Sequence, residues 1–208
     1  EVRGSMLRNI IFDVGNVLLE YRWIEAIQDT GLSREKALDA GSKVFENRLW
    51  VEFDAGNILK DDLIKEYGKL YPEYEENIRE FINNADRMQL PREEVWERVH
   101  KLKEKGFKIY LLSNYSEYLF NIHTEGVPFM DDLDGRLVSY EIHRVKPGRE
   151  IYDTLLNRYD LDASECLFLD DRKENTDTAE SLGIKSITIE SRQHVNSVLD
   201  DILNGKIS

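Results

Sequence analysis

The chain has 208 residues, enough for one sizeable domain or for one domain with a smaller insertion. It carries 28 basic and 41 acidic residues, and the resulting net charge of −13 disfavours non-specific binding to nucleic acid or to an anionic membrane. Its single cysteine, Cys166, cannot form an internal disulfide, and no apolar run reaches the length of a membrane span. We therefore expect a cytoplasmic protein with neither nucleic acid nor membrane as a partner, either a monomer or a weak homo-oligomer.

The first apolar run, "NIIFD", predicts a buried strand that ends on a carboxylate, Asp13. Residues 1–5, ahead of this strand and of Met6, are interpreted as a cloning remnant. Helical patterns follow the strand, and no comparable strand comes before Phe107. The economical interpretation is a helical insertion after the first strand. The expected domains are a core formed by residues 6–20 and 91–208, and a helical cap formed by residues 21–90.

Helix and strand patterns alternate in the second part of the chain. Pro91 is placed in the first turn of a helix that stops at Gly106, and the buried strand "FKIYLLSN" follows. After a helix-like "SEYLFNIH", we predict a strand over "GRLVSYEI" and a helix over "PGREIYDTLLNRY", with Ile151, Leu155 and Tyr159 facing inward. "CLFLDD", a short helix, "KSITIE" and a last helix complete the chain. This alternation predicts an α/β fold with a Rossmann-like parallel sheet.

Polar residues stand at the expected carboxyl ends of the strands, where ligands bind in parallel α/β sheets. They are a carboxylate, a hydroxyl with an amide, a pair of acids and a lysine: Asp13, Ser113, Asn114, Asp170, Asp171 and Lys146. Such a set suits phosphate chemistry, because it supplies a nucleophile, donors for phosphoryl oxygens and oxygen ligands for a hard cation such as Mg²⁺. The expected partner is a small phosphorylated substrate.

Four motifs in this order resemble those of the haloacid dehalogenase superfamily with an inserted helical cap: "FDVGNVL", "LLSN", "RVKPGREIY" and "LFLDDRKENTDTAESLGI". The resemblance implies that Asp13 attacks phosphorus and forms an aspartyl-phosphate. It also implies that Ser113 and the Asn114 backbone hold the phosphoryl group. Lys146 would offset the negative charge around Asp13.

The same resemblance implies a Mg²⁺ site. Asp13 and the backbone carbonyl of Gly15 would hold the ion together with Asp170 and Asp171, one of the last two acting through water. Asn175 would steady the loop instead of contacting the metal.

The chain departs from the pattern at Gly15, where most phosphatases of this superfamily have a second aspartate that protonates the leaving group. General acid catalysis contributes about 10²- to 10⁴-fold, so its loss favours substrates with a good leaving group, such as glycosyl 1-phosphates. The Asp-x-Gly-Asn form also resembles a branch that includes an α-D-glucose-1-phosphate phosphatase. Alternatively, a cap acid could replace it, and the candidates are Glu46, Glu52 and Asp54.

Other residues are interpreted as structural. The aromatic residues Trp23, Trp50 and Phe53 could line a sugar-binding surface, but core packing in the cap is the preferred interpretation. His123 and His143 are expected to be structural or surface residues.

Two further classes of function stay open. A metal-independent haloacid dehalogenase also uses an aspartate nucleophile, but it has no use for Asp170 and Asp171. A non-catalytic phosphate-binding protein is compatible with Gly15, although the other motif residues argue against it.

Overall fold

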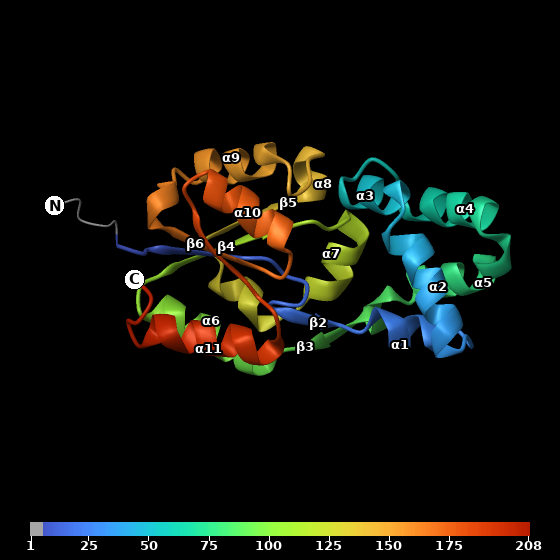
Figure 1. Ribbon diagram of the computed structural model, residues 1–208, viewed down its shortest axis with the longest axis horizontal. Helices are drawn as coiled ribbons and strands as arrows, with labels where there is room; N and C mark the ends of the chain where they lie inside the picture. Colours follow the sequence, from blue (N-terminus) through green and yellow to red (C-terminus); the bar gives the residue numbers. More distant parts are fainter. Residues whose placement is uncertain (1–5) are drawn as a thin grey trace.

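A parallel sheet of five strands forms the centre of the molecule, which the computed structural model describes over residues 6–208 (Figure 1). The interpretation of residues 1–5 lies outside the described residues. The sheet has the order β5-β4-β1-β6-β7, so the first strand of the chain lies in the middle. The strands are β1 (Asn9–Phe12), β4 (Lys108–Ser113), β5 (Gly135–Val138), β6 (Cys166–Asp170) and β7 (Lys185–Thr188). The predicted α/β class with a Rossmann-like sheet is confirmed.

Helices cover both faces of this sheet, as Figure 1 shows. Successive strand residues alternate between faces, so Ile10 and Phe12 join the hydrophobic cluster on one side and Ile11 the cluster on the other. All three are fully buried, which explains why β1 is apolar throughout. One face is covered by α6 (Glu93–Glu104) and α11 (Arg192–Leu203), and the other by α9 (Arg149–Arg158) and α10 (Lys173–Ser181).

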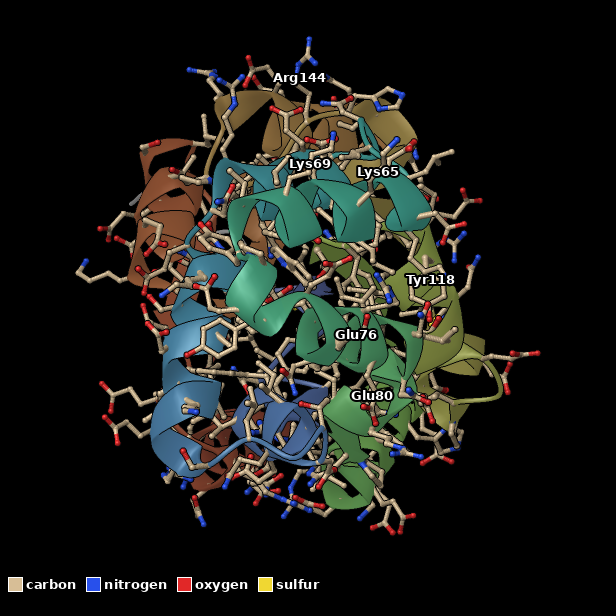
Figure 2. The ribbon with its side chains drawn as sticks, turned by 90° about the vertical axis from the view of Figure 1, so that its right-hand side faces the viewer. Lys65, Lys69, Glu76, Glu80, Tyr118 and Arg144 are labelled. Carbon is tan, nitrogen blue, oxygen red and sulfur yellow. The ribbon has the colours of Figure 1, made fainter. Side chains whose placement is uncertain are left out.

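A group of five helices lies to one side, beyond the carboxyl ends of the strands (Figure 1). They are α1 (Trp23–Gln28), α2 (Arg34–Phe45), α3 (Arg48–Asp54), α4 (Lys60–Leu70) and α5 (Glu75–Asn83). Residues 33–53 are divided between two helices because Asn47 interrupts them and accepts a hydrogen bond from the Leu49 N–H at 3.0 Å. Figure 2 shows the outer face of this group, where Lys65, Lys69, Glu76 and Glu80 lie exposed to solvent.

A two-stranded antiparallel ribbon joins the five-helix group to the rest of the chain. It pairs β2 (Leu19–Tyr21) with β3 (Gln89–Pro91), at the two points where the chain enters and leaves the group. The placement of Pro91 in a first helical turn is wrong, because Pro91 pairs with Leu19 and α6 begins only at Glu93. We propose that this ribbon marks the boundaries of a cap domain over residues 21–90.

The remaining elements connect these layers. The predicted strand over residues 135–142 ends at Val138, because the Glu141 carboxylate accepts the Val138 N–H at 3.1 Å and starts a helical turn. Tyr159 is only half-buried against Tyr110, while Tyr152 is fully buried instead. The elements that connect the layers are α7 (Glu117–Thr124), α8 (Ser139–Ile142) and the 3₁₀ turns Pro72–Tyr74, Ala85–Met88, Pro128–Asp132 and Ala163–Glu165.

The single cysteine and the character of the helices bear on two predictions from composition. Cys166 is a free thiol buried in β6, and burial raises its pKa to about 11, which disfavours the reactive thiolate. Over residues 6–208, none of the helices combines the length and the apolar character that crossing a membrane requires.

Candidate active site

The carboxyl ends of three neighbouring strands bring the predicted nucleophile and its partners together. Asp13 follows the central strand β1, and its N–H donates to the Leu169 carbonyl of β6 at 2.9 Å. On the other side, the hydroxyl of Ser113, the last residue of β4, donates to Asp13 Oδ1 at 2.6 Å. Asp13 and Ser113 are therefore held in contact although they are 100 residues apart.

Lys146 reaches this cluster from the loop before α9. Its Nζ lies 3.0 Å from Asp13 Oδ1 and 2.6 Å from Asp170 Oδ2, and it donates to the Leu112 carbonyl at 2.8 Å. Burial acts to lower the pKa of Lys146, but Asp13 and Asp170 outweigh it and raise that pKa, so the side chain is a permanent cation. Lys146 is only 4% exposed.

The Asn114 side chain holds the loop that carries Lys146. This side chain donates to the Lys146 carbonyl at 2.9 Å and accepts the Lys146 N–H at 2.8 Å. This reciprocal pair occupies the amide group, so the side chain is committed to positioning Lys146. The family resemblance implies phosphate binding by the Asn114 backbone. The side-chain bonds to Lys146 do not use that backbone group.

Three carboxylates form a candidate cation site. Asp13, Asp170 and Asp171 each place an oxygen within 4.8 Å of the others. Burial raises the pKa of Asp13 to about 7; Lys146 opposes this rise, while Asp170 and Asp171 add to it. The Lys146 ammonium contacts two of these three carboxylates, Asp13 and Asp170, and a hard divalent cation would offset the remaining negative charge. The donor set fits Mg²⁺.

The two acids after β6 have different surroundings. Asp170 is fully buried, and its oxygens accept the Arg172 N–H at 2.8 Å and the Asn175 side chain at 3.0 and 3.1 Å, in addition to Lys146. Asp171 lines the pocket. Asn175 therefore holds Asp170 in place, in agreement with the loop-steadying role expected for it.

Asn16 is a residue that the sequence reasoning missed. It adopts a left-handed backbone conformation with φ of 55°, which asparagine tolerates better than most residues. Its side chain donates to Asp171 Oδ2 at 3.0 Å and accepts the Tyr21 N–H at 3.2 Å. The buried Arg92 guanidinium holds the same turn by donating to the Asn16 carbonyl at 2.6 Å. The Gly-Asn pair that follows Asp13 was the sequence signal for a turn at this position.

A pocket of about 270 Å³ lies over these groups, and residues of the five-helix group line one side of it. Trp23 and Trp50 line it, so the prediction that they only pack in the cap core is incomplete. Both rings contact Phe45, and Trp23 also lies against Gly41, where a Cβ would stand 2.8 Å from its Cε3 atom. Phe53 is buried, as predicted.

Of the three candidate cap acids, the structure places only Asp54 among the described residues that line this pocket. Burial raises the pKa of Asp54 to about 7, the Ser116 N–H opposes the rise, and Asp13 adds to it. Glu46 is exposed, and Glu52 is paired with Arg48 at 3.3 Å and bonded to the Asn57 amide. A carboxyl group with a raised pKa therefore lines the pocket together with Asp13, from the cap side.

Gly15 faces an aromatic ring. A Cβ at this position would lie 2.7 Å from Tyr21 Cζ, so the ring fills the space that a side chain at position 15 needs. The Tyr21 hydroxyl donates to the hydroxyl of Tyr115, which contacts His123 Nδ1 at 3.2 Å. The other histidine considered, His143, contacts the Ala55 carbonyl at 2.8 Å.

The fold and the ordered site residues define a hydrolase of the parallel α/β class. The chain belongs to the haloacid dehalogenase-like hydrolase family, whose model matches residues 7–183. The family predicted from the four motifs is confirmed.

Three comparisons describe its relatives. A D-ribitol-5-phosphate phosphatase of Bacteroides thetaiotaomicron is 27% identical over 96% of this chain and 100% of its own length. The sesquiterpene phosphatase astK of Aspergillus oryzae is 28% identical over 84% of this chain and 85% of its own. A structure of the HAD family enzyme bt-2542 from Bacteroides thetaiotaomicron, in complex with magnesium and inorganic phosphate, matches with a TM-score of 0.72 and 21% identity, covering 89% of this chain and 95% of that one.

Proposed function

We propose that this chain is a Mg²⁺-dependent phosphatase that hydrolyses the phosphate ester of a small sugar or sugar alcohol. The observation that carries the proposal is the contact of one carboxylate, Asp13, with both a hydroxyl and an ammonium group beside two further carboxylates. The curated relatives named as phosphatases support the reaction class.

In this proposal Asp13 attacks phosphorus, and the bond from phosphorus to the ester oxygen breaks. A water molecule then hydrolyses the aspartyl-phosphate and regenerates Asp13. The Ser113 hydroxyl, which donates to Asp13 in the absence of substrate, would turn to donate to a phosphoryl oxygen together with the Asn114 N–H. Lys146 balances the charge of Asp13 and the phosphate. The pKa of Asp13, about 7, describes a carboxylate that burial and two acids destabilise, so an added cation favours the ionised nucleophile.

We propose that Mg²⁺ is held by Asp13, the Gly15 carbonyl and Asp171, with Asp170 behind them acting through water. Asp170 is assigned the indirect role because its oxygens already accept bonds from Lys146, Arg172 and Asn175. When bound, the ion would neutralise charge on the phosphoryl group and orient it.

We propose that Asp54 supplies the proton to the leaving oxygen, in place of the acid that position 15 lacks. This weakens the reason for restricting the substrate to glycosyl 1-phosphates, because a protonated leaving group need not be a good one. Both a glycosyl 1-phosphate and the terminal phosphate of a sugar alcohol remain within the proposal. The D-ribitol-5-phosphate phosphatase relative supports the second kind.

The test compares phosphate release from D-ribitol 5-phosphate, α-D-glucose 1-phosphate and p-nitrophenyl phosphate. Asp54→Asn should lower kcat/KM on D-ribitol 5-phosphate by about 10²-fold or more, because its alkoxide needs a proton, and much less on p-nitrophenyl phosphate. Glu52→Gln, a cap acid outside the pocket, is the matched control. Equal losses on all three esters in Asp54→Asn would contradict the role of Asp54. Release from none of them by the wild type would contradict the phosphatase proposal for these substrates.

The dehalogenase alternative is disfavoured by the same cluster. Displacement of halide by Asp13 needs no metal, and the buried Asp170 and the nearby Asp171 would then only destabilise the ionised nucleophile. A non-catalytic phosphate-binding protein would have no need for Asp54, whose burial in the pocket raises its pKa to about 7.

A further inference from the structure

Tyr21 takes the place of a side chain at position 15. It stands at the end of β2 and lines the same pocket as Asp13. A Cβ on Gly15 would lie 2.7 Å from Tyr21 Cζ and 2.9 Å from its Oη, distances that no side chain can accept without displacing the ring. Glycine at position 15 is thus what allows the Tyr21 hydroxyl to stand beside the nucleophile loop.

A chain of hydrogen bonds determines the direction of the Tyr21 proton. His123 Nε2 lies 2.7 Å from the Ala85 carbonyl, which can only accept, so Nε2 carries the hydrogen. Burial lowers the pKa of His123, so the ring is neutral and Nδ1 is an acceptor. Tyr115 therefore donates to His123 across 3.2 Å, and Tyr21 donates to Tyr115.

This direction leaves the Tyr21 oxygen with lone pairs and no free proton toward the pocket. A phenol is neutral near pH 7, because its ordinary pKa is about 10. The Tyr21 hydroxyl donates its proton to the Tyr115 oxygen in a hydrogen bond. Transfer of this proton to a leaving group would create a buried phenolate. Tyr21 is thus suited to accept a hydrogen bond and not to act as the general acid.

We propose that Tyr21 Oη accepts a hydrogen bond from a hydroxyl group of the leaving group and so selects phosphate esters that carry a hydroxyl near the ester oxygen. This inference rests on the proposed phosphatase function and narrows its substrate class. A carboxylate or ionised phosphate oxygen has no proton to offer and would meet the lone pairs of Tyr21. An alkyl group would displace water from Oη without replacing its hydrogen bond. Trp23 and Trp50 supply flat surfaces for the carbon skeleton of such a substrate.

The test uses two esters that differ by one hydroxyl, D-ribitol 5-phosphate and 4-deoxy-D-ribitol 5-phosphate. The wild type should prefer the first by about tenfold in kcat/KM, the effect of one hydrogen bond. Tyr21→Phe should bring this ratio close to one. Gly15→Ala, whose Cβ displaces the ring, should reduce the ratio in the same way. Tyr118→Phe, which removes a hydroxyl that bonds the Ile82 carbonyl outside the pocket, should keep the wild-type ratio.

The opposite outcomes separate the two proposals. A wild-type ratio near one, or a tenfold ratio that persists in both Tyr21→Phe and Gly15→Ala, would overturn hydroxyl recognition by Tyr21 while Mg²⁺-dependent phosphate release stays intact. Circular dichroism of each variant establishes that it is folded. Absence of Mg²⁺-dependent release from both esters and from p-nitrophenyl phosphate in the wild type would instead overturn the proposed function, and the inference with it.

Discussion

Asn16 links the candidate cation site to the ribbon that leads into the five-helix group. Its amide bonds Asp171 on one side and the Tyr21 backbone on the other, from a left-handed conformation. Removing a group that orients a metal ligand typically costs 10- to 100-fold in metal affinity. We therefore expect Asn16→Gly, which keeps the backbone conformation accessible, to raise the Mg²⁺ concentration for half-maximal activity by about tenfold.

Asn16→Ala serves as the comparison, because alanine removes the same bonds and also resists a positive φ. It should show the same weakened response to Mg²⁺ and a lower melting temperature than Asn16→Gly. Activity titrated with Mg²⁺ measures the first effect, and thermal unfolding measures the second. An unchanged Mg²⁺ requirement in both variants would show that Asn16 does not orient Asp171.

Whether a site residue could be predicted from the sequence depends on which segment carries it. Asp13, Ser113 and Asp170 could be predicted because strand ends in a parallel sheet meet at one edge, and the structure brings them together there. Tyr21 and Asp54 could not be placed in this way. They come from segments whose approach to the site depends on how the cap packs, and nothing in their local sequence pattern encodes that packing.

At the scale of elements, α6 and α11 are tied by ion pairs on one face of the sheet. Arg192 of α11 places Nε 2.5 Å from Glu94 Oε1 of α6 and Nη1 3.1 Å from Glu20 Oε2 of β2. The hydrogen bonds from Arg192 lower the pKa of Glu94 from 4.5 to about 2. Because this pKa is lower in the folded state, the stabilisation is complete above about pH 4.5 and is lost as the pH falls toward 2.

Glu94→Gln should therefore lower the free energy of unfolding by about 0.5–1 kcal/mol at pH 7, a value limited by solvent screening of a partly exposed pair. The difference from the wild type should shrink as the pH drops below 4.5. Urea unfolding at a series of pH values measures it, with the exposed Glu97→Gln on the same helix as the control. A difference that does not depend on pH would contradict an electrostatic origin.

Elements differed in how well their sequence specified them. The long amphipathic helices and the buried strands gave clear periodicities, and the structure contains them. The β2–β3 ribbon escaped prediction because each strand has only three residues and its pairing joins segments about 70 positions apart. The misplaced start of α6 at Pro91 has the same cause, since that residue belongs to the ribbon.

At the scale of the whole molecule, we expect the acidic cluster to make folding stability depend on a cation. Burial and Asp170 raise the pKa of Asp171, so its ionised form opposes folding in the metal-free protein. Removing one carboxylate should relieve this repulsion, and a gain of about 1 kcal/mol corresponds to roughly 2–4 °C in a chain of this size. Asp171→Asn should melt higher than the wild type in EDTA.

Added Mg²⁺ should reverse this order of melting temperatures. An ion that binds only the folded state raises the melting temperature of the wild type, and it should leave that of Asp171→Asn nearly unchanged. Differential scanning calorimetry with EDTA and with MgCl₂ measures both effects, and the exposed Asp86→Asn is the control. A wild type that is insensitive to Mg²⁺ would show that the three carboxylates do not form a metal site.

Phosphate release from D-ribitol 5-phosphate, measured with MgCl₂ and with EDTA in the wild type and in Asp13→Asn, tests the central claim most directly. If Asp13 is the nucleophile of a Mg²⁺-dependent phosphatase, only the wild type with MgCl₂ releases phosphate above background. Release that persists in EDTA, or in Asp13→Asn, would contradict this assignment.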